Sequence, residues 1–72
     1  MPLFQNHFAI NFYQKGVSKQ FARRILSQVP RAGEKLVFNS TRYLVDSVEW
    51  CLDDDATNHE YQALINVEIT EA

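Results

Sequence analysis

The chain has few of the residues that mark secreted or membrane proteins. Its single cysteine, Cys51, excludes a disulfide within the chain and makes the reducing cytoplasm the expected compartment. No apolar run is long enough to cross a membrane. The first residues lack the basic segment and the small-residue cleavage site of a signal peptide, so we expect none.

What the chain does contain is apolar and aromatic side chains, which make up 46% and 12% of its residues. With only two glycines and two prolines, this composition is too apolar and too sparsely charged for a disordered chain. A length of 72 residues lies near the lower limit for independent folding, because small domains bury a small fraction of their surface. The sequence therefore predicts a single small globular domain over residues 1–72.

Charge is divided unevenly along the chain, although the net charge is only −2. The first 42 residues hold all seven lysines and arginines beside one acid, Glu34, which gives +6. The last 30 residues hold eight acids and no lysine or arginine, which gives −8. Such a division bears on partners and on association rates rather than on the fold.

The first and last strands are predicted from alternating apolar and polar residues. Near the N-terminus, Phe8, Ile10 and Phe12 share one face of a half-buried strand. Residues 61–69 have the clearest alternation in the chain, with Leu64 as the one apolar residue on the outer face.

A hairpin is predicted between residues 34–38 and 42–52. Pro30 ends the preceding segment, and Arg31-Ala32-Gly33 turns the chain. Asn39-Ser40-Thr41 has the turn chemistry that joins the two strands.

The second strand of this hairpin changes its apolar phase at Asp46-Ser47. Before this point Tyr43 and Val45 share one face, and after it the opposite face holds Val48, Trp50 and Leu52. A β-bulge produces this shift and lets both halves of one strand face the core. Strands that bend in this way close small barrels, and on this reading Trp50 is a core anchor.

Residues 18–28 fit two structures. Apolar residues recur at helical spacing, and Ser18 is suited to cap an amphipathic helix. The preceding turn at Gly16 favours a second hairpin strand instead.

A pattern covering a third of the chain bears on this choice. It reads V-P-x-x-G-E, eight residues, then Y-x-V-x-x-V-x-W-x-L, and the matching residues are Val29, Pro30, Gly33, Glu34, Tyr43, Val45, Val48, Trp50 and Leu52. It resembles a signature of small, mostly uncharacterised proteins of phages and bacterial mobile elements, which are similar to SH3-like five-stranded β-barrels. The resemblance implies a strand ahead of the V-P pair and carries no activity.

The expected fold class is therefore all-β: a five-stranded SH3-like small barrel with a bent strand 42–52. The alternative is an α+β fold with a helix at 18–28 packed on an antiparallel sheet.

The candidates for a metal site lack the spacing that metals require. Asp53-Asp54-Asp55 has neither the alternating ligands nor the glycine of a calcium loop. Zinc needs four ligands, whereas His7, Cys51 and His59 are three scattered residues. Cys51 lies inside a predicted strand, where cysteine is usually an inert packing residue. We therefore expect no metal, no other cofactor and no enzymatic activity.

The expected function is binding to another protein. The residues predicted to carry it are Asp53, Asp54, Asp55 and Glu60, the acidic face of the chain. Together with the resemblance, this predicts a phage or mobile-element accessory factor that modulates a host protein and has no role at a membrane.

Two other functions stay open. The basic segment 15–42 is typical of a nucleic-acid-binding barrel, with Arg23, Arg24, Arg31 and Arg42 as the contacting residues. Against it stands a pI of about 5.5, because dedicated nucleic-acid binders are usually strongly basic. The third function is a homo-oligomer assembled through exposed strand edges.

Overall fold

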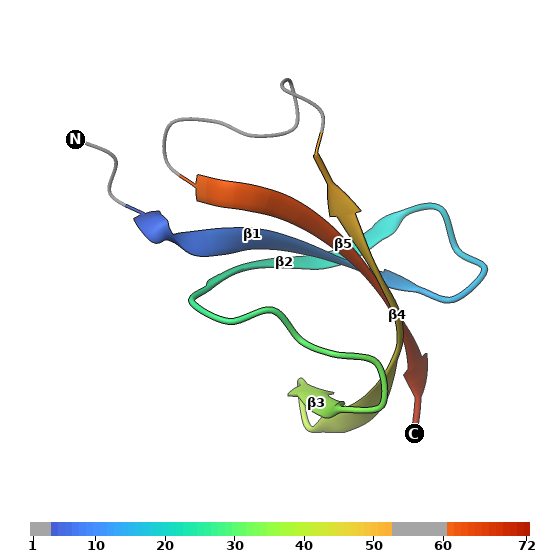
Figure 1. Ribbon diagram of the computed structural model, residues 1–72. Coiled ribbons are helices and arrows are strands. Elements are labelled where there is room, and N and C mark those ends of the chain that lie inside the picture. Colours follow the sequence, from blue (N-terminus) through green and yellow to red (C-terminus); the bar gives the residue numbers. More distant parts are fainter. Residues whose placement is uncertain (1–3, 53–60) are drawn as a thin grey trace.

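The chain forms one five-stranded sheet that curls into a half-barrel (Figure 1). A computed structural model describes residues 4–52 and 61–72. The strands follow the order β2-β1-β5-β4-β3 across the sheet, with β1 and β5 parallel and the other neighbours antiparallel. Their bounds are β1 Phe4–Gln14, β2 Gln20–Leu26, β3 Lys35–Phe38, β4 Thr41–Cys51 and β5 Tyr61–Glu71. The predicted all-β, SH3-like class with five strands is confirmed.

The core lies on the concave face of the sheet. The central strands β1 and β5 supply its fully buried centre, with Ile10, Phe12, Ile65, Val67 and Ile69 at most 1% exposed. These residues follow the period-two pattern of the sequence, because alternate side chains of a strand point to the same face. The described residues contain no helix that is long and apolar enough to cross a membrane.

The predicted bulge in β4 is present. The register against β5 runs through Val45 and resumes at Ser47, so Asp46 is the extra residue. As a result Val45 is buried before the bulge and Val48 packs against the same core after it. Both halves of β4 therefore face the core.

Residues 18–28 contain a strand, so the alternative helix at this position is wrong. The register of β2 against β1 shifts at Phe21, which makes Phe21 the extra residue of a second bulge. This bulge turns Phe21 and Ala22 to the concave side together, and Leu26 packs against the same core. The bulge thus interrupts the alternation of apolar and polar residues in this segment. For this reason the apolar residues of 18–28 have a spacing that resembles that of a helix.

The turns have the backbone that their residues predict. Gly16 and Gly33 have φ angles of +80° and +94°, a region that glycine enters without a Cβ clash. Asn39 and Ser40, at φ +50° and +68°, form the two-residue connection between β3 and β4. Positive φ at both central positions is typical of the type I′ turn, whose twist matches that of a hairpin.

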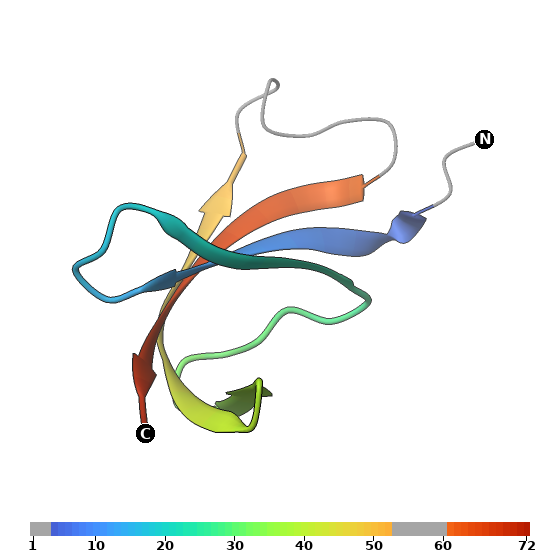
Figure 2. The same ribbon diagram turned by 180° about the vertical axis from the view of Figure 1, so that it is seen from behind.

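An aromatic cluster joins the two edge strands. No hydrogen-bonded pairing connects β2 with β3 among the described residues. Instead the Phe21 ring of β2 lies 5.4 Å from the Phe38 ring of β3 and 5.3 Å from the Tyr43 ring of β4. Phe12 of β1 completes the cluster at 5.0 Å from Phe38. Viewed from behind, the link between β2 and β3 also runs across the open side of the curled sheet (Figure 2).

Replacing Phe21 by alanine should therefore loosen the contact between β2 and β3. We expect Phe21→Ala to lower the free energy of unfolding by about 2–4 kcal/mol, measured by urea denaturation. Val37→Ala is the matched control, because Val37 is 63% exposed on β3 and should change stability by less than about 0.5 kcal/mol. Equal unfolding midpoints for the two variants would contradict this role of the cluster.

A candidate binding groove on the concave face

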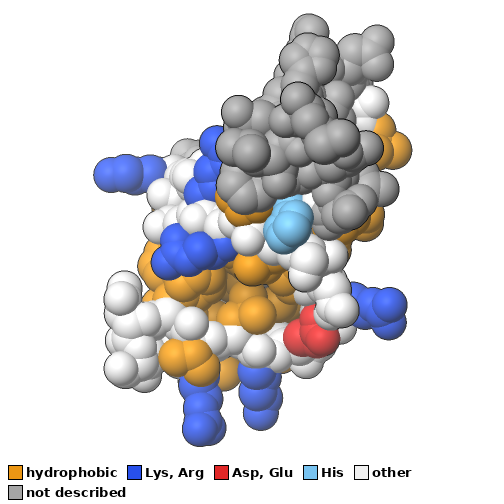
Figure 3. All heavy atoms as spheres, turned by 90° about the vertical axis from the view of Figure 1, so that its left-hand side faces the viewer, with side chains coloured by type: hydrophobic (Ala, Val, Ile, Leu, Met, Phe, Trp, Pro, Cys, Tyr) orange, Lys and Arg blue, Asp and Glu red, His pale blue; other side chains and the backbone are white. Residues whose placement is uncertain are grey.

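The concave face is hollowed at the end away from the aromatic cluster. The groove has a volume of about 990 Å³. Its apolar lining includes Phe8, Val29, Pro30, Leu36, Val48 and Trp50, and its charged lining is Arg31, Glu34 and Lys35. Figure 3 shows apolar side chains gathered in a hollow, with lysine and arginine side chains around it.

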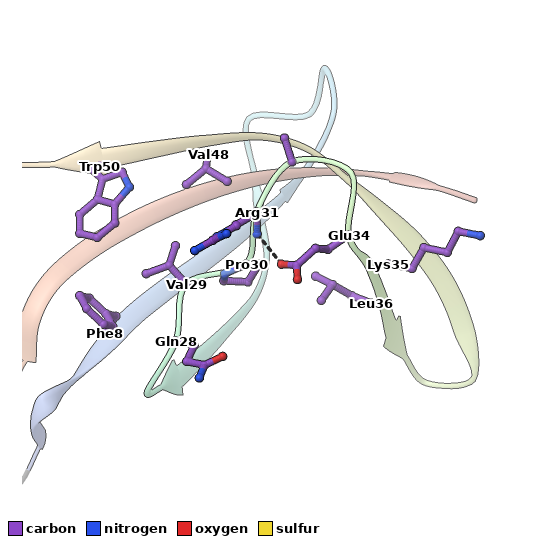
Figure 4. Close-up of a pocket in the computed structure, with 11 residues that line it drawn as sticks. Phe8, Gln28, Val29, Pro30, Arg31, Glu34, Lys35, Leu36, Val48 and Trp50 are labelled. Carbon is purple, nitrogen blue, oxygen red and sulfur yellow. Dashed lines mark hydrogen bonds between the residues drawn. The ribbon is translucent and has the colours of Figure 1, made fainter.

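One wall of the groove is the second half of β4. Val48 and Trp50 point from this strand towards Val29 and Phe8 (Figure 4). They share the concave face because they are two residues apart on a strand. The bulge at Asp46 sets this phase, so without it both side chains would point away from the groove.

The opposite wall is residues 28–32, and local hydrogen bonds hold it in place. The backbone N–H of Arg31 donates to Glu34 Oε1 at 2.6 Å, and Glu34 N–H donates to the Arg31 carbonyl at 3.1 Å. The Gly33 N–H donates to the Val45 carbonyl at 2.9 Å and ties the segment to β4. The wall is therefore part of the folded structure before any partner arrives.

Two aromatic rings form the far end of the groove. Phe8 and Trp50 meet edge-to-face with 5.6 Å between ring centroids. Ala63 of β5 lies opposite Phe8 in the sheet. Because this alanine is small, the two larger rings can meet above the strand that separates β1 from β4.

The prediction that Trp50 anchors the core is wrong. Its side chain is on the predicted concave face, but it is 48% exposed, and Leu52 beyond it is 75% exposed. The centre of the core is filled by β1 and β5, and Trp50 lies at its margin. It therefore presents a large aromatic surface to solvent.

The four arginines of the nucleic-acid hypothesis do not share one face. Arg23 and Arg42 alternate with inward residues and point to the outer face. Arg24 lies on the concave side, 5.3 Å from the centre of the Phe38 ring, and Arg31 borders the groove. The predicted partner-binding residues Asp53, Asp54, Asp55 and Glu60 lie outside the described residues.

The outer face carries a row of polar side chains across three strands. Asn11 Nδ2 donates to Asn66 Oδ1 at 3.4 Å, and Asn66 Nδ2 donates to Cys51 Sγ at 3.3 Å. The Ser47 hydroxyl donates to Glu68 Oε1 at 3.0 Å. The described residues include no cluster of three or more histidine, cysteine, aspartate or glutamate side chains suited to a metal ion.

The sequence patterns did not reveal the groove. Phe8, Val48 and Trp50 were assigned to the correct face as core residues, and Pro30 was identified only as a chain break. The groove depends on where the segment 28–32 lies against β4, and periodicity has no information about that. The exposed fraction of Trp50 is the signal that identifies the site.

Comparison of the chain with protein-family models, with curated proteins and with solved structures finds no match. The function is therefore inferred from the groove and from the charges around it.

Trp50→Ala should cost less stability than loss of a core residue. We expect a loss of about 1–2 kcal/mol for this half-exposed ring, against about 2–5 kcal/mol for Ile65→Ala in the buried centre. Thermal or urea unfolding measures both values. Trp50 is the only tryptophan, so acrylamide should also quench the fluorescence of the folded protein. A Trp50→Ala variant that fails to fold would contradict the marginal position of this residue.

Proposed function

We propose that this chain is a small non-enzymatic protein-binding domain whose concave groove receives apolar side chains of a partner protein. The observation that carries the proposal is Trp50, half exposed at the edge of a groove with two fixed walls. Tryptophan is among the residues that contribute most to binding free energy at protein interfaces.

The size and the rigidity of the groove support binding. A volume of about 990 Å³ is at the upper end of the range for sites that enclose small ligands or a few side chains. The hydrogen bonds between Arg31 and Glu34 order one wall in advance. Less conformational entropy is therefore lost when a partner binds.

The resemblance of residues 29–52 to proteins of phages and mobile elements is the basis for proposing a host protein as the partner. The single cysteine is the basis for proposing the cytoplasm as the compartment. The acids at positions 53–55 and 60 are proposed to attract a basic surface of that partner, because charges of opposite sign speed association.

Binding of single-stranded nucleic acid is the alternative. Exposed Trp50 and Arg31 line the same groove, and sites for single strands combine a stacking ring with a cation in this way. The division of Arg23, Arg24 and Arg42 between two faces counts against a continuous basic path for a phosphate backbone.

Selection from a displayed library of random peptides tests the proposal. We expect the wild-type chain to retain peptides that the Trp50→Ala variant binds at least about tenfold more weakly, the effect of losing an interface hot spot. Bound peptides should also shift the emission of Trp50.

Val37→Ala is the matched control for this selection, because Val37 is exposed on β3 and does not line the groove. This variant should retain the same peptides as the wild type. A library that yields no Trp50-dependent peptide, together with quenching of Trp50 by oligothymidylate, would favour the nucleic-acid alternative instead.

The acidic segment gives a separate prediction about rates. Replacing Asp53, Asp54 and Asp55 together by asparagine should slow association with a basic partner, while we expect the melting temperature of this variant to stay unchanged. The association rate of the wild type should fall as salt rises, and the triple variant should lose most of this dependence. An unchanged rate at low salt would contradict electrostatic attraction by this segment.

A further inference from the structure

The second half of β4 has an open backbone edge in the described part of the chain. β3 pairs only with Thr41–Leu44. This pairing is extended by one residue, because the Gly33 N–H donates to the Val45 carbonyl and the Val45 N–H donates to the Glu34 carbonyl. From Ser47 to Cys51 the described pairing partner of β4 is β5 alone. Every second residue there directs its N–H and C=O away from β5, as in any strand that is paired on one side.

This open edge borders the groove. Val48 and Trp50 lie on the edge segment and also line the hollow (Figure 4). A strand added at this edge would lie about 4.8 Å from β4, in line with β3, and alternate side chains would point to the concave face. The open backbone edge therefore suits the main chain of an extended peptide, and the apolar groove suits its alternate side chains.

We propose that the partner segment is an extended peptide that adds a strand to β4 beside Ser47–Cys51, with apolar side chains in the groove and basic side chains on the outer face. This inference rests on the proposed function and specifies how the partner is held. Peptides bound by strand addition gain affinity from main-chain hydrogen bonds and specificity from pockets for alternate side chains.

The charge of the outer face sets the choice of basic residues. Glu49 lies between Val48 and Trp50, points to the outer face, is exposed and has no ion-pair partner among the described residues. A second hollow of about 400 Å³ lies on this face and is lined by Glu49, Glu68 and Tyr13, among others. A lysine or arginine directly across from Glu49 forms the opposite-charge cross-strand pair that stabilises sheets.

The same charge disfavours a second copy of the chain at this edge. Antiparallel pairing of two copies about a two-fold axis at Glu49 would set one Glu49 directly opposite the other. Like charges in that position destabilise the pairing. The open edge of β4 beside Ser47–Cys51 is thus better suited to a different chain with alternating apolar and basic residues.

A peptide of alternating valine and lysine, about eight residues long with blocked ends, is the probe. Two isomers carry N-methyl groups, one on every valine and the other on every lysine. In a strand, the valine N–H groups face one edge and the lysine N–H groups face the other. We expect one isomer to bind like the parent peptide. The other isomer, whose methylated nitrogens face β4 and cannot donate hydrogen bonds to it, should bind at least about tenfold more weakly.

Equal affinities of the two isomers would overturn strand addition, and failure of the parent peptide to bind would overturn the alternating basic chemistry. In either case, Trp50-dependent peptides from the random library would still support the proposed function. A separate result, a random library that yields no Trp50-dependent peptide, would contradict the proposed function itself.

Amide exchange locates the added strand. With the parent peptide bound, alternate amides between Ser47 and Cys51 should exchange more slowly than in the free protein, while the others, paired with β5, stay unchanged. Slow exchange of all these amides in the free protein, together with a dimeric mass, would overturn the proposal and identify a second copy as the occupant.

Charge reversal completes the test. Glu49→Lys should weaken binding of the valine–lysine peptide by about fivefold and strengthen binding of the matching valine–glutamate peptide. Glu71→Lys is the control, because it changes the net charge equally at an exposed position opposite Tyr43, away from the open edge. Equal effects of the two variants would show a general charge effect and overturn the assigned cross-strand pair.

Discussion

The contact of Phe21 with Phe38 and Tyr43 is the interaction on which the shape of this protein depends. β2 and β3 are the two edges of the sheet, and no described backbone hydrogen bond joins them. Edge-to-face and tilted ring contacts bring them together at one end of the half-barrel. Domains of about this length typically have a net stability of only about 3–5 kcal/mol, so a cluster of this kind is expected to supply a large share of the stability of a 72-residue chain.

The groove exists because the aromatic cluster closes only one end of the half-barrel. β3 has four residues and leaves the second half of β4 without a neighbour on that side among the described residues. The segment 28–32 lies across the opening and is fixed by Arg31, Glu34 and Gly33. An open strand edge is a hazard for aggregation, and natural proteins protect such edges with charges. Exposed Glu49 and the ion pair of Asp46 with Lys15 at 3.5 Å place charge on this strand.

The two faces of the sheet differ in chemistry, and this difference links the fold to the proposed function. The concave face offers aromatic and aliphatic side chains next to an open backbone edge. The outer face offers Glu49 and Glu68 and the amides of Asn11 and Asn66. A partner that pairs with β4 meets both faces at once, because neighbouring residues of a strand point in opposite directions.

Local patterns determined the strands at residues 8–13, 34–38 and 61–69, the turns at Gly33 and Asn39-Ser40, and the bulge at Asp46. Side-chain alternation and turn chemistry need only a few neighbouring residues, so the sequence alone was sufficient for them. Only the tertiary structure decided that 18–28 contains a strand, that β1 and β5 are parallel, and that Trp50 is half exposed. Each of these depends on which distant segments become neighbours. The bulge at Phe21 disrupts the local period, and the exposure of Trp50 follows from its place at the margin of a core that β1 and β5 fill. Neither can be read from alternation within a single strand.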